Sequence, residues 1–202
     1  MAKPDQIPLV AGGAVGPFGR FVERSLVDIA QPVIKGALEA AGIAAGDLQA
    51  AFVGNAFGGA IMEQESILAQ VLLTPAGIRA IPMHTVKNAC SSGSNAVHLA
   101  WSAVAYGQYD CVLVLGAEKL THADKRRSFA ALATATDHKS VAENRSVFMD
   151  VNAARANSYM ARYGATPRHF AQVAAKNRRH AGLNERASLR SPLSVEEVLA
   201  DR

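Results

Sequence analysis

The sequence has few of the residues and runs that mark several protein classes. Its two cysteines, Cys90 and Cys111, are too few for a disulfide framework and are not spaced as zinc ligands, so no metal site is expected. No apolar run reaches the roughly 18–20 residues of a membrane-spanning helix, and the first residues lack the apolar core of a secretory signal. These absences predict a reducing, cytoplasmic location and no membrane segment.

Charge is also scarce. Only 19% of the 202 residues are charged, against about a quarter in globular domains, and 50% are hydrophobic, which excludes disorder of the whole chain. The net charge is +4, with basic residues gathered at 125–127 and 176–179. These groups lack the interleaved aromatics of a nucleic-acid binding stripe, so we expect no nucleic-acid partner. A small polyanionic ligand and a solvated helix face both remain open.

Short apolar stretches alternate with segments of helical period over residues 1–117. We expect strands at 7–11, 51–53, 83–87 and 111–115. We expect helices at 26–41, 64–73 and 91–106, where Pro32 either kinks the first helix or starts it. This alternation predicts an α/β layer with a largely parallel sheet.

The second half of the sequence reads differently. Residues 121–147 are polar without a strong period, which predicts a long irregular excursion. Start and stop signals predict helices at 152–163 and from Pro167 to about residue 181, and a capping box at Ser194 opens a last helix. Because that helix has about two turns before the sequence ends, we interpret the C-terminus as a truncation.

Cys90 lies between the third expected strand and the most regular expected helix. The unpaired N–H groups and the dipole at a helix N-terminus favour a thiolate, the nucleophilic form of cysteine. The small residues 91–94 leave room for a substrate to approach. From the turn alone, a nucleophile and an ordinary buried cysteine both remain open. Cys111 lies in an apolar strand and is interpreted as a core residue.

The segment Asn88-Ala89-Cys90-Ser91-Ser92-Gly93-Ser94 resembles the nucleophile segment of the thiolases, in particular the sterol-carrier-protein-type (SCP-x-like) branch. A cysteine followed by Ser-Ser-Gly also resembles the ketosynthases, so this motif alone does not separate the families. The match over residues 163–202 does. The matching stretches are 16–21, 53–55, 115–119, 163–167 with Phe170, 176–177 and 193–202.

The resemblance implies a thiolase-like α/β fold of two similar halves, each with a five-stranded mixed sheet, and a helical loop domain inserted in the first half. Residues 1–117 would be most of the N-terminal half. Residues 118–202 would be the loop domain, which holds coenzyme A in the family, and the chain would stop before the C-terminal half. The family is usually dimeric, so a homodimer is expected.

The resemblance also implies acyl transfer, with Cys90 as the catalytic residue. Its thiolate would attack an acyl-CoA and become acylated. Coenzyme A, or the carbanion of a second acyl-CoA, would then take the acyl group. The backbone N–H of Cys90 would be one oxyanion donor. Coenzyme A is thus a substrate, and no permanently bound cofactor is expected.

The family's base histidine, its second active-site cysteine and further oxyanion donors belong to the C-terminal half. None of the six histidines here matches those motifs: His84, His98, His122, His138, His169 and His180. We therefore expect no turnover by this chain alone. Two alternatives remain. One is a retro-aldolase acting on CoA thioesters of steroid side chains with a small partner protein, without cysteine acylation. The other is a non-catalytic half-thiolase subunit that pairs with the missing half.

Overall fold

The computed structural model describes residues 7–137 and 147–201. The chain divides into two compact units, residues 1–16 with 21–131 and residues 17–20 with 132–202. A domain boundary at residues 117 and 118 stays a prediction. The strands are β1 (Ala50–Gly54), β2 (Met83–Val86) and β3 (Val112–Gly116). The helices are α1 (Leu26–Ala41), η1 (Ala45–Asp47), α2 (Gly58–Met62), α3 (Leu68–Leu73), η2 (Thr74–Ala76), α4 (Ser92–Ala105), α5 (Lys125–Ala133), α6 (Val147–Tyr163), α7 (Pro167–Gly182) and α8 (Val195–Ala200).

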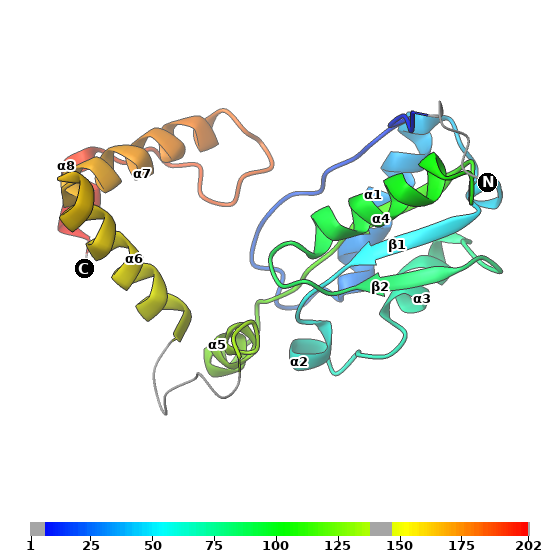
Figure 1. Cartoon of the computed structure of the whole chain (residues 1–202), viewed down its shortest axis with the longest axis horizontal. Coiled ribbons are helices and arrows are strands. Elements are labelled where there is room, and N and C mark those ends of the chain that lie inside the picture. The colour runs from blue at the N-terminus through cyan, green and yellow to red at the C-terminus, as the bar shows by residue number, and fades with distance from the viewer. Residues whose placement is uncertain (1–6, 138–146, 202) are drawn as a thin grey trace. The chain divides into compact units, whose positions relative to one another are not determined.

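The three strands form a parallel sheet in the order β2-β1-β3. Side chains of the central strand β1 alternate between two apolar clusters. Ala51 and Val53 pack with α1 and α3, whereas Ala50 and Phe52 pack with α4. Figure 1 shows α4 across one face of the sheet in the first unit. The α/β layer and three of the four expected strands are therefore confirmed.

The expected strand at 7–11 is wrong. Residues 7–18 pair with no strand that the structure describes, and Ile7, Leu9 and Val10 are mostly exposed. The segment instead follows α1 so closely that a Cβ on Gly12 would lie 2.5 Å from the backbone nitrogen of Ala41. A strand needs a neighbour for its backbone N–H and C=O groups. An apolar pattern does not provide that neighbour.

Helix α1 begins after Ser25 and ends before Gly42, and Pro32 does not start it. A capping box joins Ser25 and Asp28, and Gly42 ends the helix with a φ of +66°. Pro32 lies inside the helix, so the alternative start at that residue is wrong. Because proline has no N–H, it leaves the carbonyl of Asp28 without its usual donor. Arg24 Nη2 fills this place with a hydrogen bond of 2.9 Å.

The second unit keeps most of its predicted helix ends, but α6 begins at Val147, five residues before the predicted start at residue 152. Gly164 (φ +66°) follows α6, Thr166 precedes α7 in a capping box with His169, and Ser194 caps α8 through the N–H of Glu197. Gly182 is the last residue of α7 and does not lie beyond it.

Two further expectations need correction. Helix α3 begins at Leu68, four residues later than predicted, and α5 occupies part of the expected excursion at 121–147. Helix α5 is Ala-rich, which favours helix. It buries only Ala131 among its residues, so it has no apolar period to recognise. Residues 138–146 of that segment, with His138, lie outside the described residues.

Candidate active site

Cys90 lies in the turn that joins β2 to α4. It precedes Ser91, the N-cap of α4, and its side chain is exposed. The predicted strand–turn–helix context of this cysteine is confirmed. Cys111 lies just before β3, is half-buried and packs against the larger apolar cluster. Burial raises the pKa of its thiol, and the nearby carboxylate of Asp47 adds to this effect.

The backbone of the Cys90 turn is strained. Ala89 has a φ of +45°, in the left-handed region that residues with a Cβ rarely adopt, at a cost of about 1–2 kcal/mol. Two backbone bonds close the turn, from Ser91 N to Asn88 O (2.9 Å) and from Ser92 N to Ala89 O (3.2 Å). The Ser92 hydroxyl accepts from Asn88 N (2.9 Å) and donates to Ala89 O (2.7 Å).

Backbone donors remain available beside the thiol. The N–H of Cys90 makes no hydrogen bond with any residue that the structure describes, and the Ser91 side chain does not cap α4. Unpaired N–H groups at the start of a helix favour negative charge. This arrangement is suited to stabilise the oxyanion formed when a thiol attacks a carbonyl.

A second polar cluster joins the carboxyl ends of β1 and β3. Asn55 is 1% exposed. Its Nδ2 donates to Ala117 O (2.8 Å) and to Glu118 Oε1 (3.0 Å), and its Oδ1 accepts from Gly58 N (2.7 Å). Glu118 Oε2 also accepts from Ala56 N at 2.7 Å. These bonds fix the loops on the sheet edge that also carries the Cys90 turn.

Sequence reasoning assigned no role to this cluster. Asn55 comes directly after β1 and Glu118 two residues after β3, and polar residues at the ends of parallel strands meet at one sheet edge. That signal was available in the sequence.

The cations near the site are bonded to other protein groups. Lys119 Nζ donates to the carbonyls of Val22 (2.9 Å) and Arg24, and Lys87 Nζ lies 2.8 Å from Glu65 Oε1. Further along the chain, Arg126 pairs with Asp124 and Arg127 with Glu63. Two of the three basic residues at 125–127 are therefore engaged in ion pairs, whereas Lys176 and Arg179 are exposed on α7.

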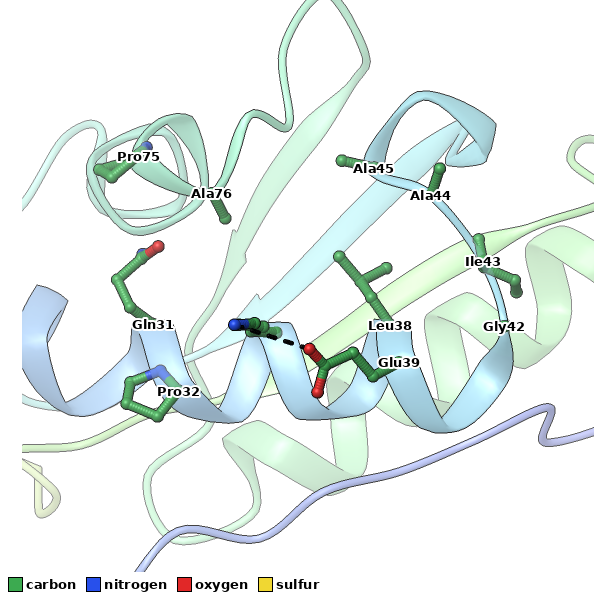
Figure 2. Close-up of a pocket in the computed structure, with 11 residues that line it drawn as sticks. Gln31, Pro32, Leu38, Glu39, Gly42, Ile43, Ala44, Ala45, Pro75 and Ala76 are labelled. Carbon is green, nitrogen blue, oxygen red and sulfur yellow. Dashed lines mark ion pairs between the residues drawn. The ribbon is translucent and has the colours of Figure 1, made fainter.

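Two grooves of the first unit do not include Cys90. One groove, of about 870 Å³, follows α1 and is shown in Figure 2. Its lining is mostly apolar, and Lys35 lies 3.7 Å from Glu39 while Gln31 Nε2 donates to Leu72 O (2.8 Å). A second groove, of about 630 Å³, lies between β2 and α4. The thiol is on an open surface, and no group of three metal-ligating side chains occurs among the described residues.

Comparison with known proteins supports the resemblance. The model of the thiolase N-terminal domain matches residues 9–192. Acetyl-CoA acetyltransferase of Methanothermobacter thermautotrophicus is 34% identical over 190 residues, which cover 94% of this chain and 49% of that protein. Human sterol carrier protein 2 is 28% identical over 186 residues, which cover 89% of this chain and 33% of that protein. The chain thus spans about half or less of the length of these relatives.

Two solved structures share the fold. The Ltp2–ChsH2(DUF35) aldolase aligns with a TM-score of 0.64 at 19% identity, covering 96% of this chain and 50% of that chain. Acetyl-CoA acetyltransferase from Syntrophomonas wolfei aligns with a TM-score of 0.60 at 16% identity, covering 86% and 46%. No helix in the described part of this chain is long and apolar enough to span a membrane. With its parallel sheet, its cysteine turn and this match over most of its length, the chain belongs to the thiolase family and corresponds to the N-terminal half of its members.

Proposed function

We propose that the chain is the N-terminal part of a cytoplasmic acyl-CoA acyltransferase that forms or cleaves 3-ketoacyl-CoA through an acylated Cys90. The observation that carries this proposal is the exposed thiol in a strained turn at the start of α4, beside a backbone N–H that donates to none of the described residues. Relatives named acetyl-CoA acetyltransferase, at 34% identity, support the same reaction class.

In the proposed reaction, the Cys90 thiolate attacks the carbonyl carbon of an acyl-CoA. The negative charge moves to the carbonyl oxygen, where the N–H of Cys90 is placed to donate. When the C–S bond to coenzyme A breaks, the electron pair leaves with the CoA thiolate and the acyl group stays on Sγ. Transfer to the carbanion of a second acyl-CoA then forms the C–C bond of a 3-ketoacyl-CoA and releases the Cys90 thiolate. In the cleavage direction, the thiolate attacks C3 of a 3-ketoacyl-CoA, and the C2–C3 bond breaks with its electron pair on the departing acyl-CoA carbanion, which takes up a proton. The thiolate of coenzyme A then takes the acyl group from Sγ and releases Cys90.

Coenzyme A is a substrate in this proposal, and its phosphates need positive charge. Lys176 and Arg179 are exposed three residues apart on α7, so they share one face of that helix. We infer that the basic residues of the second unit contact the coenzyme A phosphates. The charge-removing variant Lys176→Ala with Arg179→Ala should weaken coenzyme A binding, measured by calorimetry, without unfolding the chain.

Two protein partners belong to the same proposal. The C-terminal thiolase half would supply the histidine base and close the open surface around Cys90. A second copy of the chain would pair through the face of α4 that carries Val97 and Trp101, which are one turn apart and more than half exposed. Sedimentation of wild type and of Trp101→Glu should show a dimer for the first and a monomer for the second.

Intact mass after incubation with acetyl-CoA and longer acyl-CoAs tests the acylation. We expect one added acyl group, found on the peptide that carries Cys90, in wild type and in Cys111→Ala but not in Cys90→Ala. Absence of acylation in the chain and in the chain combined with a C-terminal thiolase half would reject this function. That outcome would favour the retro-aldolase alternative with a small partner protein, or a half-thiolase subunit without catalysis.

A further inference from the structure

We propose that Ser92 is a positioning residue for Cys90: its hydroxyl fixes the turn from which the thiol and the N–H of Cys90 project. This inference rests on the proposed acyl transfer. Ser92 is 5% exposed, and it is one of two buried polar residues in the described part of the chain. Its hydroxyl accepts from Asn88 N (2.9 Å) and donates to Ala89 O (2.7 Å). A single oxygen therefore bonds to the two peptide groups that flank the Asn88–Ala89 peptide bond.

The turn needs the two hydrogen bonds of the Ser92 hydroxyl because the backbone of Ala89 is left-handed, with a φ of +45°. Relaxation toward a common backbone conformation would rotate the peptide groups on either side of Ala89. The two backbone bonds of the turn use the carbonyls of Asn88 and Ala89. Among the described residues, only the Ser92 hydroxyl accepts from the N–H of Asn88. Without that hydroxyl, the N–H of Asn88, which follows β2, loses its hydrogen bond to α4.

Ser92 is itself held in place by the sheet. A Cβ on Gly54 would lie 2.8 Å from the carbonyl carbon of Ser92 and from the nitrogen of Gly93, so β1 and α4 are in backbone contact here. The neighbouring Ser91 is exposed and its side chain does not cap the helix. Of these two adjacent serines, Ser92 is the one that can transmit the position of the sheet to Cys90.

This role predicts a split between two reactions of the same thiol. Acyl transfer needs the sulfur and the N–H of Cys90 to meet one carbonyl group together, so it depends on the turn geometry. Alkylation by iodoacetamide needs only an accessible thiol. A variant with a loosened turn should therefore lose acylation while its alkylation changes far less.

The test compares Ser92→Ala, Ser92→Thr and the matched control Ser102→Ala on the same helix, with acetyl-CoA and with iodoacetamide. For Ser92→Ala we expect acylation of Cys90 to fall about tenfold, the rate equivalent of one lost hydrogen bond. Ser92→Thr, which keeps the hydroxyl, should recover most of the rate. Iodoacetamide labelling of the half-buried Cys111 reports unfolding in each variant. If Ser92→Ala unfolds, Ser92→Cys replaces it, since a thiol is a much weaker donor.

Hydrogen exchange at the Asn88 amide separates this inference from the proposed function. We expect faster exchange in Ser92→Ala than in wild type. Unchanged exchange, or acylation of Ser92→Ala at the wild-type rate, overturns the positioning role. If wild type is not acylated at all, the proposed function fails, and the Asn88 exchange rate alone still decides whether Ser92 holds the turn.

Discussion

At the carboxyl end of β1, the backbone of Gly54 lies directly against that of Gly93 in the first turn of α4. A Cβ on Gly54 would lie 2.8 Å from both the Cα and the nitrogen of Gly93. No real Cβ is tolerated at this distance from backbone atoms, so the contact requires glycine at position 54. The reverse is not true, because a Cβ on Gly93 would meet no atom within 4 Å. The close approach thus depends on the strand residue and brings α4, with the Cys90 turn, onto the sheet.

The first prediction follows from this asymmetry. We expect Gly54→Ala to lower the free energy of unfolding by about 2–3 kcal/mol, because overpacking forces the backbone of β1 or α4 to move. Gly116→Ala is the matched control, since Gly116 is the register partner of Gly54 in β3 and a Cβ there meets nothing within 4 Å. Urea unfolding measures both. An equal effect at the two positions would contradict the proposed contact.

The sequence predicted the layer and the turn because these depend on local signals. Three strands and α4 follow from apolar period, and the end of α1 follows from Gly42. The strand at 7–11 failed because pairing is a tertiary property that an apolar stretch does not encode. Helix α5 was missed because only Ala131 of its nine residues is buried, which leaves no apolar stripe.

The candidate site was likewise predicted only in part from the sequence. The place of Cys90 between strand and helix could be read from the sequence, since both flanking elements have strong patterns. That Asn55 and Glu118 share one sheet edge could be read from their places after β1 and β3, but their hydrogen bond across 63 positions could not. Neither could the left-handed Ala89, because alanine gives no sign of a positive φ.

A second prediction concerns the buried amide of Asn55. Asn55→Ala leaves the N–H of Gly58 and the carbonyl of Ala117 without this partner, so we expect a loss of about 2–3 kcal/mol in the free energy of unfolding. Asn95→Ala on α4 is the control, since the Asn95 side chain makes no hydrogen bond among the described residues. Thermal unfolding monitored by circular dichroism compares them. Similar melting temperatures for the two variants would refute the structural role of Asn55.

A third prediction concerns the two thiols. Cys90 should alkylate faster than Cys111 across the pH range, because Cys90 is exposed whereas Cys111 is half-buried. Desolvation also raises the pKa of Cys111, so its labelling should require a higher pH than that of an ordinary cysteine. Peptide mass spectrometry after short exposure to iodoacetamide gives both rates. Cys90→Ala should leave the Cys111 rate unchanged, and earlier labelling of Cys111 in wild type would disprove the predicted order.

The last prediction concerns how the free energy of unfolding changes at acidic pH. The Ser25 hydroxyl and the Ser25 backbone N–H both donate to the Asp28 carboxylate, at 2.6 Å and 3.0 Å, and hold the pKa of Asp28 below its ordinary value. In the unfolded chain this carboxyl has a pKa of about 3.9. Because the folded-state pKa is the lower one, the unfolded state takes up the proton first as the pH falls.

The contribution of Asp28 is therefore complete above the unfolded-state pKa and is lost as the pH falls through the folded-state value. Asp28→Asn, which removes this titration, should make the free energy of unfolding less dependent on pH between about pH 5 and pH 3. Glu39→Gln is the control on the same helix, since Glu39 pairs only at 3.7 Å with the exposed Lys35. Urea unfolding at a series of pH values decides the matter. If Asp28→Asn and wild type lose stability in parallel on acidification, the capping box does not act through this carboxylate.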